Sequence, residues 1–134
     1  MKLLIVDDHA GVRTMIRDLV SLPGDTVCEC ATGDDAVRVA REFAPDAVTM
    51  DVRLPGLGGF AATRAIRALV PSARVVIVST YDQPELRFAA QTAGAADYLA
   101  KDHLENLRSV LLRRQPGNES STAPSLSDRT GRTG

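Results

Sequence analysis

The chain has 134 residues, enough for one domain that buries roughly two thirds of the surface its unfolded chain exposes. Its net charge of -1 gives no electrostatic attraction to nucleic acid or to an anionic membrane, and its 44% hydrophobic content is that of a soluble globular protein. No apolar stretch approaches the roughly 18 residues of a membrane span. The first residues lead directly into an apolar run, so we expect no signal peptide.

Short apolar runs alternate with helical patterns along the chain. Residues 3–6 are predicted as a strand, and a helix with apolar positions from 12 to 20 follows and ends at Pro23 and Gly24. The next strands are expected at 26–31, 47–50, 75–78 and 97–100, and the next helices at 36–43, 60–70, 86–93 and 104–113. Short, continuously apolar strands separated by helices favour a doubly wound α/β fold of three layers with a parallel sheet.

The predicted fourth helix and the C-terminal segment are the least hydrophobic parts of this pattern. The helix at 86–93 offers Leu86 and alanines as its apolar face, so it should be the most weakly packed. Residues 115–134 contain only Ala123 and Leu126 as aliphatic side chains. We therefore expect a domain at 1–114 and a disordered tail or linker at 115–134.

The only two cysteines, Cys28 and Cys30, lie on a predicted strand with one residue between them. Their side chains would point to the same face, which disfavours a disulfide, and His9 and His103 are not spaced to complete a metal site with them. We expect both cysteines to pack in the core of a protein of the reducing cytoplasm.

Polar residues follow four of the apolar runs directly: Asp7 and Asp8, then Asp51, Ser79 and Lys101. In open α/β sheets the ligand site lies beyond the carboxyl ends of the strands, so these side chains should converge. Three carboxylates repel one another unless positive charge is present, which Lys101 and a hard divalent cation such as Mg²⁺ would supply. An aspartate carboxylate can then act as a nucleophile toward a phosphoryl group, with its charge neutralised by the metal and the lysine.

Three segments of the sequence carry a resemblance to a known family. Residues 3–9 (LLIVDDH), 51–56 (DVRLPG) and 94–102 (GAADYLAKD) resemble bacterial response-regulator receiver domains, in unbroken order over residues 1–114. The Asp-Asp-His start and the Lys-Asp ending are most similar to receivers of the NarL/FixJ type. The resemblance implies a flavodoxin-like (βα)5 fold with strand order 2-1-3-4-5. It also implies that the protein is phosphorylated by a sensor histidine kinase or a phosphotransfer protein.

The resemblance also implies a metal site. Asp51 corresponds to the phosphoacceptor, Asp8 to the direct Mg²⁺ ligand and Asp7 to its support, with Asp51 itself contributing to the metal. The backbone carbonyl of Arg53 corresponds to the remaining protein ligand. The chain would catalyse only its own phosphorylation and dephosphorylation, and would not be an enzyme otherwise.

The same resemblance assigns the residues that respond to phosphorylation. Ser79 corresponds to the hydroxyl that binds the phosphoryl group, Lys101 to the phosphate-binding lysine and Tyr98 to the aromatic switch residue. The less favoured alternative for Tyr98 is an ordinary half-buried strand aromatic. The output would be the surface of the fourth helix, fifth strand and fifth helix, through which a homodimer could form. Arg53 and Tyr81 stand two residues after Asp51 and Ser79, at positions that tune phosphoryl lifetime in receivers.

Two alternatives compete with this interpretation. His9, next to the acidic pair, is expected to pack or cap rather than to catalyse. A phosphatase of the haloacid-dehalogenase class also uses an aspartate nucleophile and Mg²⁺, but it requires an acid/base aspartate at the position of Arg53 and a cap domain. Because the sequence also lacks a basic cluster or a helix-turn-helix segment, we expect no DNA binding by this chain alone, and it is either a stand-alone receiver or part of a longer regulator.

Overall fold

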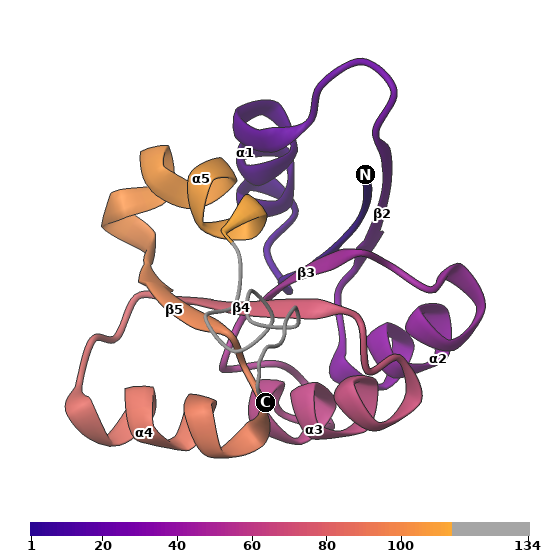
Figure 1. Cartoon of the computed structure of the whole chain (residues 1–134). Coiled ribbons are helices and arrows are strands. Elements are labelled where there is room, and N and C mark those ends of the chain that lie inside the picture. The colour runs from indigo at the N-terminus through magenta and orange to yellow at the C-terminus, as the bar shows by residue number, and fades with distance from the viewer. Residues whose placement is uncertain (114–134) are drawn as a thin grey trace, which may run out of the picture.

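Each predicted apolar run forms a strand of a single parallel sheet in the computed structural model, which describes residues 1–113 (Figure 1). The strands are β1 (Lys2–Val6), β2 (Thr26–Cys30), β3 (Ala47–Met50), β4 (Arg74–Ser79) and β5 (Asp97–Ala100). They lie in the order β2-β1-β3-β4-β5, so the predicted fold class and strand order are confirmed. The predicted tail at 115–134 and the domain boundary at 114 lie outside the described residues.

Helices cover both faces of the sheet, as Figure 1 shows. The helices are α1 (Ala10–Val20), α2 (Gly33–Phe43), α3 (Gly59–Leu69), α4 (Pro84–Ala93) and α5 (Leu107–Leu112), with a 3-10 helix, η1 (Lys101–Asn106), before α5. Successive strand residues alternate between faces, so Leu4 and Val6 pack with α2, α3 and α4, whereas Leu3 and Ile5 pack with α1 and α5. Strands buried on both sides in this way explain the continuous apolar runs.

Local signals in the sequence set several element boundaries. The Thr32 hydroxyl accepts a hydrogen bond from the backbone N–H of Asp35 and caps α2. Gly94, with a φ of 101°, ends α4 in the left-handed conformation that favours glycine. Cys28 and Cys30 are free and pack on the α2 side of the sheet, as expected. Within residues 1–113, no helix has the length and apolar character needed to cross a membrane.

The prediction of one continuous fifth helix at 104–113 was wrong. Residues Lys101–Asn106 form the 3-10 helix, interrupted by the non-helical backbone of His103, and α5 spans only Leu107–Leu112. Leu104, Leu107, Val110 and Leu111 are all buried. A spacing of three residues fits both a 3-10 turn and an α-turn, so the apolar pattern could not locate the change.

The α4 helix is thinly packed, as predicted. Its only fully buried residues are Ala90 and Ala93, whereas Phe88 keeps 71% of its surface exposed. Alanine buries little apolar area, so the packing energy that holds α4 on the sheet is small.

Thr49 in β3 supplies a test of the core. It lies between Ile5 and Val76 in the sheet register, and its buried hydroxyl has no hydrogen-bond partner among the described residues. Thr49→Val should therefore raise the free energy of unfolding by about 1 kcal/mol, because an unpaired buried hydroxyl is costly. Urea denaturation measures this change.

The matched control is Thr63→Val in α3. The Thr63 side chain is also buried, but its hydroxyl donates a 2.8 Å hydrogen bond to the Gly59 carbonyl. This substitution should lower the free energy of unfolding by about 1 kcal/mol. A fall in the free energy of unfolding for Thr49→Val, like that expected for Thr63→Val, would show that the Thr49 hydroxyl has a hydrogen-bond partner.

Candidate functional site

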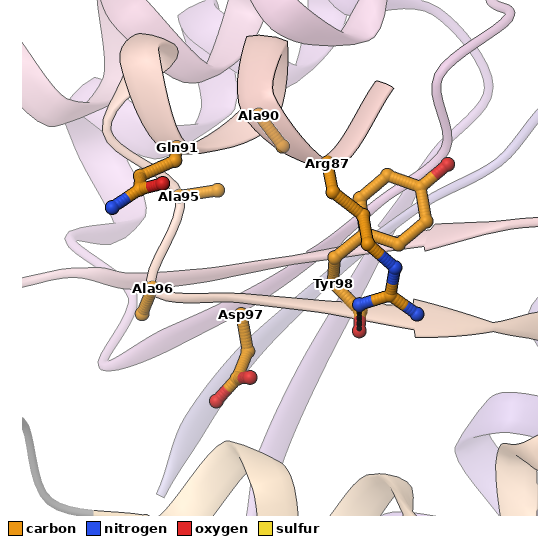
Figure 2. Close-up of a pocket in the computed structure, with 7 residues that line it drawn as sticks. All are labelled: Arg87, Ala90, Gln91, Ala95, Ala96, Asp97 and Tyr98. Carbon is orange, nitrogen blue, oxygen red and sulfur yellow. Dashed lines mark hydrogen bonds between the residues drawn. The ribbon is translucent and has the colours of Figure 1, made fainter. Parts of the chain in front are cut away.

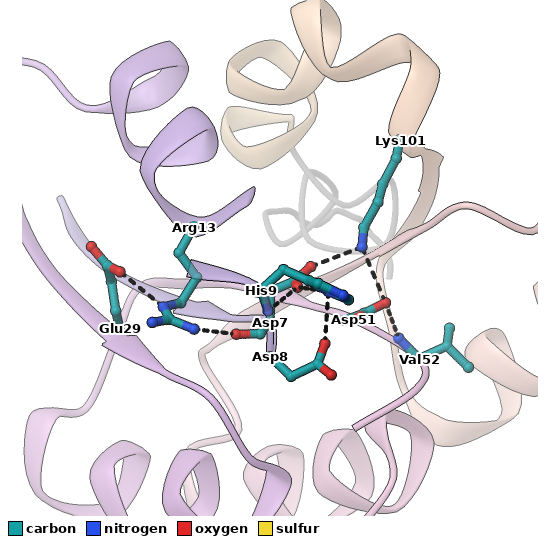
Figure 3. Close-up of polar contacts among 8 residues, drawn as sticks. All are labelled: Asp7, Asp8, His9, Arg13, Glu29, Asp51, Val52 and Lys101. Atoms are coloured by element: carbon teal, nitrogen blue, oxygen red, sulfur yellow. Dashed lines mark hydrogen bonds and ion pairs between the residues drawn. The ribbon is translucent and has the colours of Figure 1, made fainter. Parts of the chain in front are cut away.

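The structure brings together the charged residues that follow β1, β3 and β5. The Lys101 ammonium lies 2.9 Å from Asp7 Oδ2 and 3.6 Å from Asp51 Oδ1, between the two carboxylates (Figure 3). Asp8 lies beside them with one third of its side chain exposed. The predicted convergence of Asp7, Asp8, Asp51 and Lys101 at the carboxyl edge of the sheet is therefore present.

Main-chain hydrogen bonds fix the backbone positions of Asp7 and Asp51 at the ends of β1 and β3. The Asp7 N–H donates to the Cys30 carbonyl at 3.1 Å, and the Asp51 N–H donates to the Val6 carbonyl at 3.0 Å. These bonds extend the parallel ladder one residue beyond β1 and β3. Asp7 and Asp51 are consequently only 1% and 7% exposed, so their charges are largely removed from water.

The first turn of α3 lies against the backbone of Asp51. A β-carbon added to Gly59 would stand 2.0 Å from the Asp51 carbonyl oxygen. The Val52 N–H donates to Asp51 Oδ1 at 2.9 Å and orients the carboxylate. Both contacts depend on main-chain atoms, so the side chain of Asp51 is held by the fold itself.

Burial and charge shift the pKa values of the site in consistent directions. Burial raises the pKa of Asp51 above its usual 3.8, the charge of Asp7 raises it further, and Lys101 offsets part of this change. Burial alone would lower the pKa of Lys101, but its hydrogen bond to Asp7 and the charge of Asp51 outweigh burial and raise it. Lys101 pairs with Asp7 and Asp51, and Asp8 adds a third carboxylate to the cluster. The negative charge of the three carboxylates therefore exceeds the positive charge of the one lysine among them.

The donor atoms of this cluster fit a divalent cation. One ligand atom from each of Asp7, Asp8, His9 and Asp51 lies within 4.8 Å of the others. The set is dominated by carboxylate oxygens, the donors that hard cations prefer. The cluster could therefore bind a metal, and its members include three of the four predicted ligands. The fourth, the carbonyl of Arg53, stays a prediction.

His9 lies closer to the cluster than expected. It occupies the N-cap position of α1, but its side chain makes no capping hydrogen bond. Its Nδ1 instead lies 3.0 Å from Asp8 Oδ1 and 3.3 Å from Asp7 Oδ1. The expectation that His9 packs or caps missed this proximity to the acidic pair.

Tyr81 connects the predicted switch residues through its main chain. Its N–H donates to the Ser79 hydroxyl oxygen at 3.1 Å, and its carbonyl accepts a hydrogen bond from the Tyr98 hydroxyl. Tyr98 is 8% exposed, so in this structure the ring is turned inward. Within residues 1–113, the Ser79 hydroxyl makes this contact and no direct hydrogen bond to Asp51.

The side chain of Tyr81 meets Arg53. The Arg53 guanidinium lies 4.5 Å from the centre of the Tyr81 ring, a cation-π contact between the loops that follow β3 and β4. Sequence reasoning noted both positions but could not predict that the two side chains touch.

A pocket of about 380 Å³ lies between α4 and β5, within the predicted output surface (Figure 2). The Arg87 guanidinium lies 4.9 Å from the centre of the Tyr98 ring at one end of it. The residues that line it are Arg87, Ala90, Gln91, Ala95, Ala96, Asp97 and Tyr98. The inward position of Tyr98 therefore contributes directly to the shape of this surface.

The sheet order and the charged cluster place the chain among doubly wound α/β domains that act at the carboxyl edge of the sheet. A family model described as "Response regulator receiver domain" matches residues 3–112, and the chain belongs to this family. It is a receiver domain of two-component signalling, a family in which phosphorylation occurs on aspartate. The prediction of a receiver domain is thus confirmed.

Individual relatives agree with this assignment. The chain is 41% identical over 103 residues to "Response regulator GacA" of Pseudomonas aeruginosa, covering 75% of this chain and 48% of the relative. It is 36% identical over 101 residues to "Chemotaxis protein CheY" of Thermotoga maritima, covering 75% of this chain and 84% of the relative. The chain thus spans about half the length of GacA and most of the length of CheY.

Solved structures include receivers of the predicted subtype. A two-component response regulator of the LuxR family from Aurantimonas sp. superimposes with a TM-score of 0.71 at 34% identity, covering 87% of this chain and 90% of that one. The signal receiver domain of the putative response regulator NarL from Mycobacterium tuberculosis gives a TM-score of 0.72 at 28% identity, covering 84% and 97%.

The raised pKa of Asp51 generates a prediction about stability. A carboxyl whose pKa is higher in the folded state binds its proton more tightly there, so stability falls as pH rises from about 4 through the folded pKa. Above that window the full penalty remains. Asp51→Asn should therefore be more stable than the wild type at about pH 7 in metal-free buffer, and the difference should close toward about pH 4.

Urea denaturation at several pH values, with a chelator present, measures this difference. The control is Asp102→Asn, because the Asp102 side chain is 82% exposed and lies outside the cluster. A variant at Asp51 that matches the wild type at every pH would show that its charge carries no penalty in the fold.

Proposed function

We propose that Asp51 is the phosphoacceptor of this receiver and that a sensor histidine kinase or a phosphotransfer protein is its donor. The observation that carries the proposal is a buried Asp51 carboxylate beside Lys101, with the ligand atoms of Asp7 and Asp8 within 4.8 Å. Burial and neighbouring charges are what distinguish Asp51 from ordinary surface aspartates, so an exposed carboxylate would be a weaker candidate.

The two oxygens of Asp51 would have separate tasks. Oδ1 accepts the Val52 N–H and faces Lys101, whereas Oδ2 makes no hydrogen bond within the described residues. Oδ2 would attack the phosphorus atom of the donor, forming an acyl phosphate as the bond from phosphorus to the donor's leaving atom breaks. Lys101 would neutralise negative charge on the transferred group.

We further propose Mg²⁺ as the cation of the cluster, held by Asp7, Asp8, Asp51 and the carbonyl of Arg53. When bound, Mg²⁺ would supply positive charge that offsets the repulsion between the carboxylates and the incoming phosphoryl oxygens. The protein would act in the cytoplasm and would catalyse no reaction beyond its own phosphorylation and dephosphorylation.

The output would pass through Ser79, Tyr81 and Tyr98. Ser79 accepts a hydrogen bond from the Tyr81 N–H and keeps its own proton free to donate to a phosphoryl oxygen. Any shift of Ser79 would be transmitted to the Tyr81 backbone through its N–H. The Tyr81 carbonyl would pass the shift on to the Tyr98 hydroxyl. The weakly packed α4 helix would then be the element whose position phosphorylation biases, together with β5 and α5, where a homodimer could also form.

The first test is labelling with acetyl phosphate in the presence of Mg²⁺. The wild type should incorporate one phosphoryl group, and Asp51→Asn should incorporate none, because the amide keeps the shape but not the nucleophile. Mass spectrometry of the intact protein measures incorporation. Asp102→Asn should label like the wild type, since its side chain is 82% exposed.

Two results would refute this assignment. One is undiminished labelling of Asp51→Asn, and the other is labelling of the wild type that survives an excess of chelator.

The second test addresses the output. Ser79→Ala should still be labelled at Asp51, but the phosphoryl mimic beryllofluoride should change amide hydrogen exchange across residues 84–101 less than in the wild type. A hydrogen bond to a charged group contributes about 1.5–3 kcal/mol, which is roughly tenfold to more than a hundredfold in a two-state equilibrium. Tyr98→Phe should reduce the change as well, since it removes the hydroxyl that contacts Tyr81. A wild-type response in both variants would contradict the proposed route.

A further inference from the structure

Arg13, on the first turns of α1, reaches the backbone of the acidic cluster. Its Nη1 donates a 2.7 Å hydrogen bond to the carbonyl oxygen of Asp7, and its Nε donates to Glu29 Oε1 at 3.0 Å (Figure 3). The Arg13 side chain is only 18% exposed, so its guanidinium is largely shielded from water. The planar guanidinium serves both acceptors at once, which a point-charge ammonium cannot do in the same way.

Glu29 holds Arg13 in this position. Its second oxygen, Oε2, accepts from Arg17 Nε at 2.8 Å, so two arginines one helical turn apart share one carboxylate of β2. Burial would raise the pKa of Glu29, but the hydrogen bonds from Arg17 and Arg13 outweigh it and lower the pKa. Glu29 is therefore ionised at neutral pH and anchors the guanidinium of Arg13.

The contact acts on the peptide that joins Asp7 to Asp8. Because a peptide unit is planar, holding the Asp7 carbonyl also fixes the direction in which the chain enters Asp8. Asp8 needs such support, since one third of its side chain is exposed and it pairs with the largely exposed His9. Neither Arg13 nor Glu29 is among the possible metal ligands of the acidic cluster.

We propose that Arg13 is a positioning residue for the divalent-cation site, acting through the Asp7 carbonyl and anchored by Glu29. The inference rests on the metal site of the proposed function and adds a residue that does not touch the metal. Groups that orient metal ligands typically change metal affinity 10- to 100-fold when removed.

Charge and positioning predict opposite signs for the removal of Arg13. Arg13 is a cation close to the carboxylates, so its loss should by Coulomb's law strengthen the binding of Mg²⁺. Loss of the hydrogen bond to the Asp7 carbonyl should weaken binding, because the Asp7–Asp8 peptide is then free to rotate. The direction of the change therefore separates the two roles.

The experiment is isothermal titration of Mg²⁺ into the full chain at about pH 7.5 and low ionic strength. Arg13→Gln should raise the dissociation constant about tenfold. Arg17→Gln is the matched control: it removes the same charge from α1 and a partner of the same Glu29, but no contact with Asp7. Its dissociation constant should stay within about twofold of the wild type or fall slightly.

Two further variants guard against an unfolded Arg13→Gln protein. Arg13→Lys keeps the positive charge but lacks the planar fork that serves both acceptors, and Glu29→Gln weakens the anchor. Both should weaken Mg²⁺ binding in the same direction as Arg13→Gln, with melting temperatures in chelator close to that of the wild type. Unchanged or tighter binding in the Arg13 variants, or an equal loss in Arg17→Gln, overturns the positioning role.

Asp8→Asn separates this inference from the function on which it rests. If wild-type affinity survives Asp8→Asn, the metal site is wrong and the positioning role fails with it. If Asp8→Asn abolishes binding while the Arg13 variants bind like the wild type, the metal site stands and only the role of Arg13 is refuted.

Discussion

The ion pair between Lys101 and Asp7 is the interaction on which the site depends. At 2.9 Å and largely shielded from water, it joins the end of β5 to the end of β1 across the two intervening strands. The lysine is the cation that lets Asp7 and Asp51 be buried together, because two neighbouring carboxylates in a low-dielectric environment would otherwise favour protonation. The pair does not complete the neutralisation. Negative charge on the carboxylates remains in excess at the carboxyl edge of the sheet, and binding of a cation or a proton would reduce this excess.

The connection from this edge to the α4–β5 surface runs through main-chain atoms. Tyr81 offers its N–H to Ser79 and its carbonyl to Tyr98, so a displacement of the Tyr81 backbone alters hydrogen bonds in the two peptide units on either side of its α-carbon. The neighbouring α4 helix buries two alanines and little else, which makes its repositioning energetically accessible. A rigid sheet that holds the carboxylates is thus combined with a weakly held helix nearby. The sheet that holds the charged residues is well packed, whereas the α4 helix, whose movement would carry the signal, is weakly packed.

Much of this architecture could be predicted from the sequence, because a parallel sheet ties each strand end to one edge of the molecule. The positions of Asp7, Asp51 and Lys101 follow from where apolar runs stop. The strand order came from the resemblance and not from periodicity. Sequence reasoning missed contacts that residue type and spacing do not encode. The contact between Arg13 and Glu29 depends on how α1 lies beside β2, and the contacts of Tyr81 with Ser79 and Tyr98 use its backbone groups. The Arg13 and Arg17 spacing of one helical turn was the only available signal.

The close approach of α3 to the end of β3 has a consequence for how this site can vary. A β-carbon on Gly59 would collide with three backbone atoms, the carbonyl oxygen and carbon of Asp51 and the α-carbon of Val52, and none of them can rotate away as a side chain would. Position 59 is therefore as restricted as the charged residues, although it carries no functional group. A larger residue at this position would displace the Asp51 carboxylate without changing a single polar atom, and natural variants of the domain should retain glycine here even where the surrounding loop diverges.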